Sequence, residues 1–158
     1  MPRIAQRWAA LAVIFIFLAA PATAGEWPHP GTHSLASDKS FARLVKALNG
    51  AIKENGMFAV TKASASAGAK RRGIDIAGNM VIGVFRNDFA VRMLAASVEA
   101  GIEAPPRFYI TDDGDGSATL PYRTPSAIFA PYGTAALDEM AGELDVIFAA
   151  IAEQAVED

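Results

Sequence analysis

The chain has 158 residues, no cysteine, and 14 basic against 17 acidic side chains, a formal net charge of −3. This length fits one domain, and the absence of cysteine excludes disulfides, thiol chemistry and cysteine-ligated metal sites. The acidic balance argues against nucleic acid or anionic lipid as a partner, because both require clustered positive charge.

The first 24 residues predict an export signal. Arg3 and Arg7 form a basic start, residues 8–20 are uninterruptedly apolar, and Ala22-Thr23-Ala24 matches a small-x-small cleavage site. The apolar run is too short for the roughly 20 residues of a membrane-spanning helix. We therefore expect cleavage after Ala24, an exported, periplasmic or secreted protein with 12 basic and 17 acidic residues (net charge −5), and no stable membrane anchoring after cleavage. An uncleaved anchor is the alternative.

The first half of the exported chain predicts two helices and a strand. Residues 25–36 form an irregular tail, with a short first strand at 32–36 as one alternative. A helix from residue 38 to 55, capped by Ser37 or Asp38, follows from its apolar spacing. Residues 57–62 predict a strand, and residues 63–72 a short helix whose end is stabilised by three basic side chains. These are Lys70, Arg71 and Arg72.

The second half predicts three strands and two helices. A continuous apolar run at 80–85 is typical of a covered strand, and Asp88 is expected to cap a helix that ends at Gly101. Its inward residues are expected to be Phe89, Val91, Met93, Leu94 and Val98. Strands at 108–111 and 118–122 flank Asp112–Gly116, which predicts a hairpin. Pro121 is expected at an edge or a bulge.

The C-terminal part is expected to be a loop followed by a long helix. Residues 125–133 predict an apolar, aromatic loop, and residues 134–156 a helix with one apolar stripe. The stripe contains Leu137, Met140, Leu144, Ile147, Phe148 and Ile151. The pattern predicts an α+β fold, a single small domain at 37–158. It has an antiparallel sheet of about four to five strands, helices packed on one face, and a long C-terminal helix.

Several short strings resemble a known family. They are Asn55-Gly56 followed by Met57-Phe58-Ala59-Val60, Ala67-Gly68-Ala69-Lys70-Arg71-Arg72-Gly73, Arg86-Asn87, Ala104-Pro105, and Tyr122-x-x-Pro125. In this order the chain is similar, over about residues 38–125, to the domain of unknown function 302 (DUF302) family, as an exported member. The chain departs from the family at Phe85-Arg86-Asn87-Asp88, where Gly-Asn-Pro is frequent. The resemblance implies a compact α+β fold and little biochemistry.

Two clusters suggest metal sites, and neither is favoured. His29 and His33 are the only histidines, and they are expected in a Pro-rich tail without the rigid surroundings that hold metal ligands. With both outside the domain, histidine catalysis has no base. Asp112–Gly116 resembles the start of a calcium loop but lacks the later glutamate. We expect no metal, no cofactor and no catalytic residue.

Two groups of residues are candidates for ligand binding. Arg86, Asn87 and Asp88 lie between a strand and a helix start, where backbone amides can meet an anion, although a capped turn explains them as well. Amphipathic aromatic and basic residues near the last strand suggest a groove or a self-association surface, with plain packing as the alternative. These are Tyr122, Arg123, Phe129 and Tyr132.

Three functions therefore remain open. The first is a non-enzymatic exported module that binds a small apolar or anionic molecule, or a protein partner, but no nucleic acid. The second is a histidine-independent enzyme that uses carboxylate and tyrosine groups such as Asp88 and Tyr122. The third is a structural subunit of a homo-oligomer, such as a homodimer.

Overall fold

The computed structural model describes residues 27–157, so the predicted export signal and residues 25–26 lie outside the described residues. The first elements are β1 (Thr32–Ser37), α1 (Phe41–Glu54), β2 (Phe58–Ala63), α2 (Ala65–Lys70), β3 (Asn79–Phe85) and α3 (Asn87–Ala96). They are followed by the 3-10 helix η1 (Glu99–Glu103), β4 (Arg107–Asp112), β5 (Ala118–Arg123), α4 (Pro125–Phe129), the 3-10 helix η2 (Ala130–Tyr132) and α5 (Ala135–Glu157). Over this part of the chain, no helix has the length and apolar character that a membrane crossing requires.

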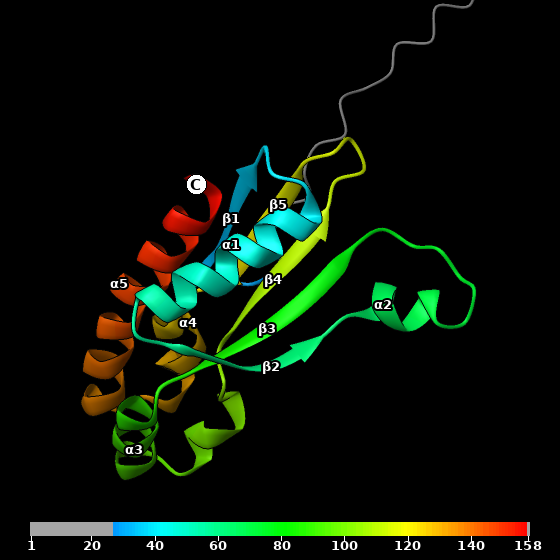
Figure 1. The fold of residues 1–158 in the computed structure, drawn as a ribbon. Coiled ribbons are helices and arrows are strands. Elements are labelled where there is room, and N and C mark those ends of the chain that lie inside the picture. The colour runs from blue at the N-terminus through cyan, green and yellow to red at the C-terminus, as the bar shows by residue number, and fades with distance from the viewer. Residues whose placement is uncertain (1–26, 158) are drawn as a thin grey trace, which may run out of the picture.

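The strands form one sheet in the order β1-β5-β4-β3-β2, and every neighbouring pair is antiparallel (Figure 1). Helices α1 and α5 pack on one face of this sheet. The side chains between them are fully buried and include Ile82, Phe108, Ile110 and Leu120. The predicted α+β architecture, with an antiparallel sheet and helices on one face, is confirmed.

The long C-terminal helix contributes a large part of the core, as its apolar stripe predicts. Leu137, Met140, Leu144, Phe148 and Ile151 of α5 are buried, and Ile147 is partly buried. The ring of Phe148 stacks on that of Phe108 at a centroid distance of 4.8 Å. This contact attaches α5 to the middle of the sheet.

For α3, the prediction is wrong about which side chains face the core and about where the helix ends. Only Phe89 and Met93 are buried, whereas Val91, Leu94 and Val98 are 59%, 47% and 72% exposed. The helix ends at Ala96 and is followed by η1. The narrow contact with α5 buries only one i, i+4 stripe, so the other apolar side chains face solvent.

Both predicted helix caps are also wrong. Arg86, rather than Asp88, is the N-cap of α3, and Asp88 lies in its first turn. Ser40 is the N-cap of α1, and its side chain makes no capping hydrogen bond. The hydroxyl of Ser37 instead accepts a hydrogen bond from the backbone N–H of Lys39 at 3.3 Å.

The position of Pro121 differs from the expectation, because β5 is an interior strand. Its pairing with β1 is continuous, whereas its pairing with β4 skips Leu120 and Pro121. Proline has no N–H to donate, and the gap that this leaves lies in the pairing of β5 with β4 and not in its pairing with β1. The expected loop at 125–133 is helical, since Thr124 accepts a hydrogen bond from Ala127 N–H and Pro125 occupies the first turn of α4.

His33 belongs to the sheet and not to a separate tail. It lies opposite Tyr122 in the β1–β5 register, and the two rings stack at 5.4 Å. The alternative strand at 32–36 is thus present as β1. The premise that both histidines lie outside the domain is wrong for His33.

Candidate functional site

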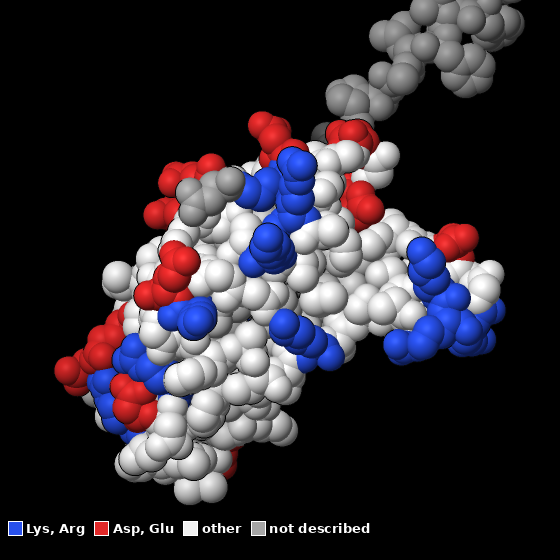
Figure 2. Space-filling view, viewed as in Figure 1, with Lys and Arg blue, Asp and Glu red and all other residues white. Residues whose placement is uncertain are grey.

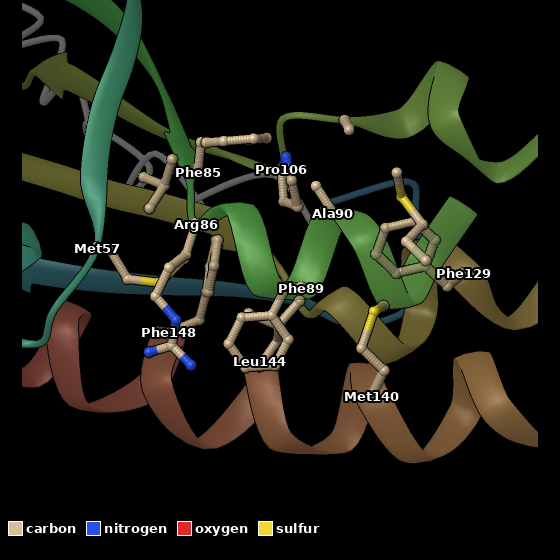
Figure 3. A pocket seen from close by; sticks show the side chains of 13 residues that line it. Met57, Phe85, Arg86, Phe89, Ala90, Pro106, Phe129, Met140, Leu144 and Phe148 are labelled. Carbon is tan, nitrogen blue, oxygen red and sulfur yellow. The ribbon is translucent and has the colours of Figure 1, made fainter. Parts of the chain in front are cut away.

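A first hollow lies among α3, α5 and the sheet and is shown in Figure 3. Its walls include Met57, Phe89, Met140, Leu144 and Phe148, and its volume is about 30 Å³. A space this small admits only water-sized molecules, and its apolar walls offer a water few hydrogen-bond partners. We interpret this hollow as a packing gap and not as a ligand site.

The side chain of Arg86 lies at this gap and is already engaged. Its Nε and Nη2 donate hydrogen bonds to the two carboxylate oxygens of Asp88 at 2.8 and 3.0 Å. The guanidinium carbon also lies 4.3 Å from the centre of the Phe89 ring. The hydrogen bond from Arg86 lowers the pKa of Asp88, so this carboxylate is ionised at neutral pH. At the start of α3, Arg86 is thus already paired with a carboxylate of the protein itself.

The second hollow, of about 300 Å³, is larger and is bordered by side chains of β3, β4 and β5. Strand alternation explains its location. Phe108 and Ile110 point into the helix-covered core, so Arg107 and Tyr109 between them point to the other face. Val81, Pro121 and Arg123 alternate with core residues in the same way. The hollow thus lies on the face of the sheet that α1 and α5 leave open.

The segment before β1 forms one wall of this hollow through Trp27 and His29, together with Thr32 at the start of β1. The segment is held by the carbonyl of Gly31, which accepts a hydrogen bond from Thr124 N–H at 2.8 Å. Gly31 has a positive φ of 72°, and a Cβ there would lie 2.3 Å from the Cβ of Ala127. Only glycine fits this close approach without displacing α4.

Two arginines supply positive charge to the second hollow. Arg123 donates one hydrogen bond from Nη2 to the carbonyl of Ala127 at 3.3 Å, while its Nε is buried with no hydrogen-bond partner. Within residues 27–157 neither Arg123 nor Arg107 forms an ion pair. A buried guanidinium N–H without an acceptor costs free energy.

The hollow also contains a carboxylate that already has a partner. Glu103 of η1 accepts a hydrogen bond from the hydroxyl of Tyr132 at 3.1 Å. Partial burial, followed by this hydrogen bond and the charge of Glu103, raises the pKa of the Tyr132 phenol. Tyr132 therefore stays protonated and holds Glu103 at the rim.

The structure divides the residues predicted for ligand binding between the two hollows. Tyr122 and Arg123 line the second hollow, and Tyr132 borders it through Glu103. Arg86 and Phe129 line the first, whereas Asn87 and Asp88 are exposed and line neither. The carboxylate of Asp88 pairs with Arg86 and lines neither hollow, whereas Tyr122 lines the second, so the two residues suggested for an enzyme do not share a hollow.

Tyr122 itself lies in an apolar environment. Its ring is 5.3 Å from that of Phe108, and burial raises the pKa of its phenol. Sequence reasoning missed Arg107, Tyr109 and Glu103. For the first two the signal was available, because alternation in Arg107-Phe108-Tyr109-Ile110 assigns them to the face opposite the buried pair.

The acidic hairpin forms a turn, as predicted. The side chain of Asp113 accepts hydrogen bonds from the hydroxyls of Ser117 and Thr119. The backbone N–H of Asp113 donates a hydrogen bond to the carbonyl of Ser117. In the part of the chain that the structure describes, no three His, Asp or Glu side chains gather as metal ligands would.

The described fold is thus an α+β domain with one open sheet face, and comparison with known proteins identifies its family. The family model "Domain of unknown function DUF302" matches residues 33–155, so the chain belongs to the DUF302 family. The solved structures include a similar protein, the uncharacterized conserved protein DUF302 from Bacillus stearothermophilus. The TM-score is 0.72 at 16% identity, and the match covers 80% of this chain and 98% of the other. At this identity the likeness concerns the fold alone. No curated protein matches the chain.

Proposed function

We propose that this protein is a binding module that holds a small, largely apolar molecule with one anionic group in the second hollow. The volume of about 300 Å³ lies at the lower end of the range for small-molecule sites. Its walls combine apolar side chains with a few polar groups, as such sites do. The apolar and aromatic wall residues are Trp27, Val81, Pro106, Tyr109, Pro121 and Ile128.

The single observation that carries this proposal is the state of Arg123. Its buried Nε has no acceptor, and no carboxylate of the described chain neutralises its charge. A carboxylate on the ligand would pair with the guanidinium of Arg123 and would also interact with Arg107, since both residues line the hollow. Glu103 discourages a ligand with a second anionic group, since it lies in the same wall.

A comparison of acids with their neutral amides tests the proposal. Binding of phenylacetate and hexanoate is measured by calorimetry or ligand-observed NMR, beside phenylacetamide and hexanamide. We expect the acids to bind more tightly. A hydrogen bond to a charged group contributes about 1.5–3 kcal/mol, so Arg123→Met should weaken binding of the acids by about 10- to 150-fold.

The matched control is Arg92→Met, which removes an exposed arginine that pairs with Glu143 outside the hollow. Affinity in this variant should equal that of the parent protein. Equal affinity for acids and amides, or equal loss in the two variants, would refute the proposed role of Arg123. Melting of each variant shows whether a loss of binding reflects loss of fold.

We also propose that the module is exported. The support is the sequence of residues 1–24, with cleavage expected two residues before the first described residue, Trp27. Amino-terminal sequencing of the exported protein should begin at Gly25. A sequence that begins at Met1 would contradict this expectation.

A further inference from the structure

An arm at residues 58–78 contributes little to the core of the protein. It contains β2, α2 and the segments that lead into β3, and it projects from the body (Figure 1). No residue of this arm is buried. Beyond the pairing of β2 with β3 and the partly buried Ala59, the arm adds little to the stability of the fold.

The arm is nevertheless held by specific hydrogen bonds. The side-chain oxygen of Asn79 accepts a hydrogen bond from Ala65 N–H at 2.9 Å at the start of α2. At the other end Ile74 N–H donates to the carbonyl of Ala69 at 3.1 Å, and Gly73 has a positive φ of 74°. These bonds satisfy both ends of a short helix that the core does not support.

The tip of the arm combines basic and aliphatic side chains. Lys70, Arg71 and Arg72 are exposed, and Ile74 and Ile76 are 45% and 50% exposed. Figure 2 shows the basic side chains gathered at the tip. The arm has four basic residues and one acidic residue, a formal charge of +3 in a chain of −3.

We infer that the tip of this arm binds reversibly to an anionic lipid surface. Cationic side chains would lie among the headgroups while the two isoleucines enter the boundary with the acyl chains. A protein partner is less favoured, because a stable protein interface buries about 800 Å² on each side and the tip is a single short turn with its flanks. A bilayer sets no such minimum area.

The net acidity of the chain does not oppose this contact. Residues 81–157 contain 12 of the 17 acidic residues and only four basic ones, whereas residues 32–80 contain eight basic and three acidic residues. Charge is thus separated along the chain, and the arm belongs to the basic half. The expectation from net charge, which disfavoured anionic lipid, does not describe this local surface. This inference is independent of the ligand proposed for the second hollow.

The test is sedimentation of the full exported chain with vesicles of phosphatidylcholine, with and without phosphatidylglycerol. Binding should require phosphatidylglycerol and should weaken strongly at about 1 M salt, where the Debye length is about 3 Å. Each cation near such a surface contributes about 1 kcal/mol, or about fivefold. The double variant Arg71→Gln/Arg72→Gln should therefore bind about 25-fold more weakly.

The matched control is Arg43→Gln/Lys46→Gln, which removes the same charge from exposed positions on α1. Its binding should fall by no more than about threefold. Replacement of Ile74 and Ile76 by serine should weaken binding at low salt as well as the binding that remains at high salt. The inference would be overturned if binding to vesicles did not depend on phosphatidylglycerol. Equal weakening of vesicle binding in both charge variants would overturn it too. Loss of self-association in the arm variant, without lipid binding by the parent, would instead assign the tip to a second copy of the chain.

Discussion

The docking of α5 onto the sheet predicts a large loss of stability for Leu144→Ala. Leu144 is 4% exposed, and it lines the first hollow beside Met140 and Phe148 (Figure 3). The substitution removes three carbon atoms from the core, and each buried carbon group contributes about 0.8 kcal/mol. The transfer contribution alone is therefore about 2.4 kcal/mol.

The cavity that remains adds to this value. It would join the existing gap of about 30 Å³, so its walls start from an imperfect fit. Three methionines border the gap, Met57, Met93 and Met140, and their side chains are flexible enough to fill part of the new space. We expect a total loss of about 3 kcal/mol, in the lower half of the range of about 2–5 kcal/mol for such substitutions.

Urea unfolding of the parent and the variant measures this difference. Val146→Ala is the control, because Val146 lies on the same helix and is 71% exposed. Its free energy of unfolding should change by no more than about 0.5 kcal/mol. If the two variants differ by less than about 0.5 kcal/mol, Leu144 does not attach α5 to the core as described.

Two further predictions concern the wall of the second hollow and the surface charges. Gly31→Ala should lower the melting temperature more than Gly133→Ala does, because both glycines have positive φ but only Gly31 would place a Cβ against other residues. Equal melting temperatures would show that the segment before β1 is not packed against α4. The hydrogen bond from Arg92 lowers the pKa of Glu143 below 4.5, so its contribution to stability is present above that pH and is lost as the pH falls through the lowered pKa. Glu143→Gln should make stability less dependent on pH there, and an unchanged dependence would contradict this assignment.

Most elements were predictable because their signals are local. Phe108 and Ile110 alternate with polar residues and identify β4, while the spacing of Leu137, Met140 and Leu144 identifies the buried stripe of α5. Such patterns depend only on the period of each element. Such patterns therefore identify a segment as a helix or a strand reliably when only one face of that segment is apolar.

The prediction failed where two arrangements satisfy the same local pattern. In α3, Val91, Leu94 and Val98 are as apolar as Phe89 and Met93, and only the position of α5 decides which set is buried. The spacing of apolar residues within α3 does not say where α5 lies, so it cannot predict which of these residues are buried.

Long-range pairing explains the other misses. Pro121 is interior because β1, some 90 residues earlier, adds to the outside of β5. The same pairing places His33 beside Tyr122. The second hollow needs this pairing as well, since Trp27, Arg107 and Arg123 come from three separate segments. Its chemistry could be read from residue types, but its assembly could not.

The separation of core, hollow and arm has a consequence for how the protein can change without unfolding. The core lies between the sheet and the helices α1 and α5, the second hollow lies on the other face, and the arm has no buried residue. Arg123 and the residues at the tip of the arm lie outside the apolar core, so their substitution leaves the main apolar contacts intact and its cost in stability should be small. For this reason a loss of ligand binding in Arg123→Met and a loss of lipid binding in the arm variant can be read separately from each other and from loss of fold.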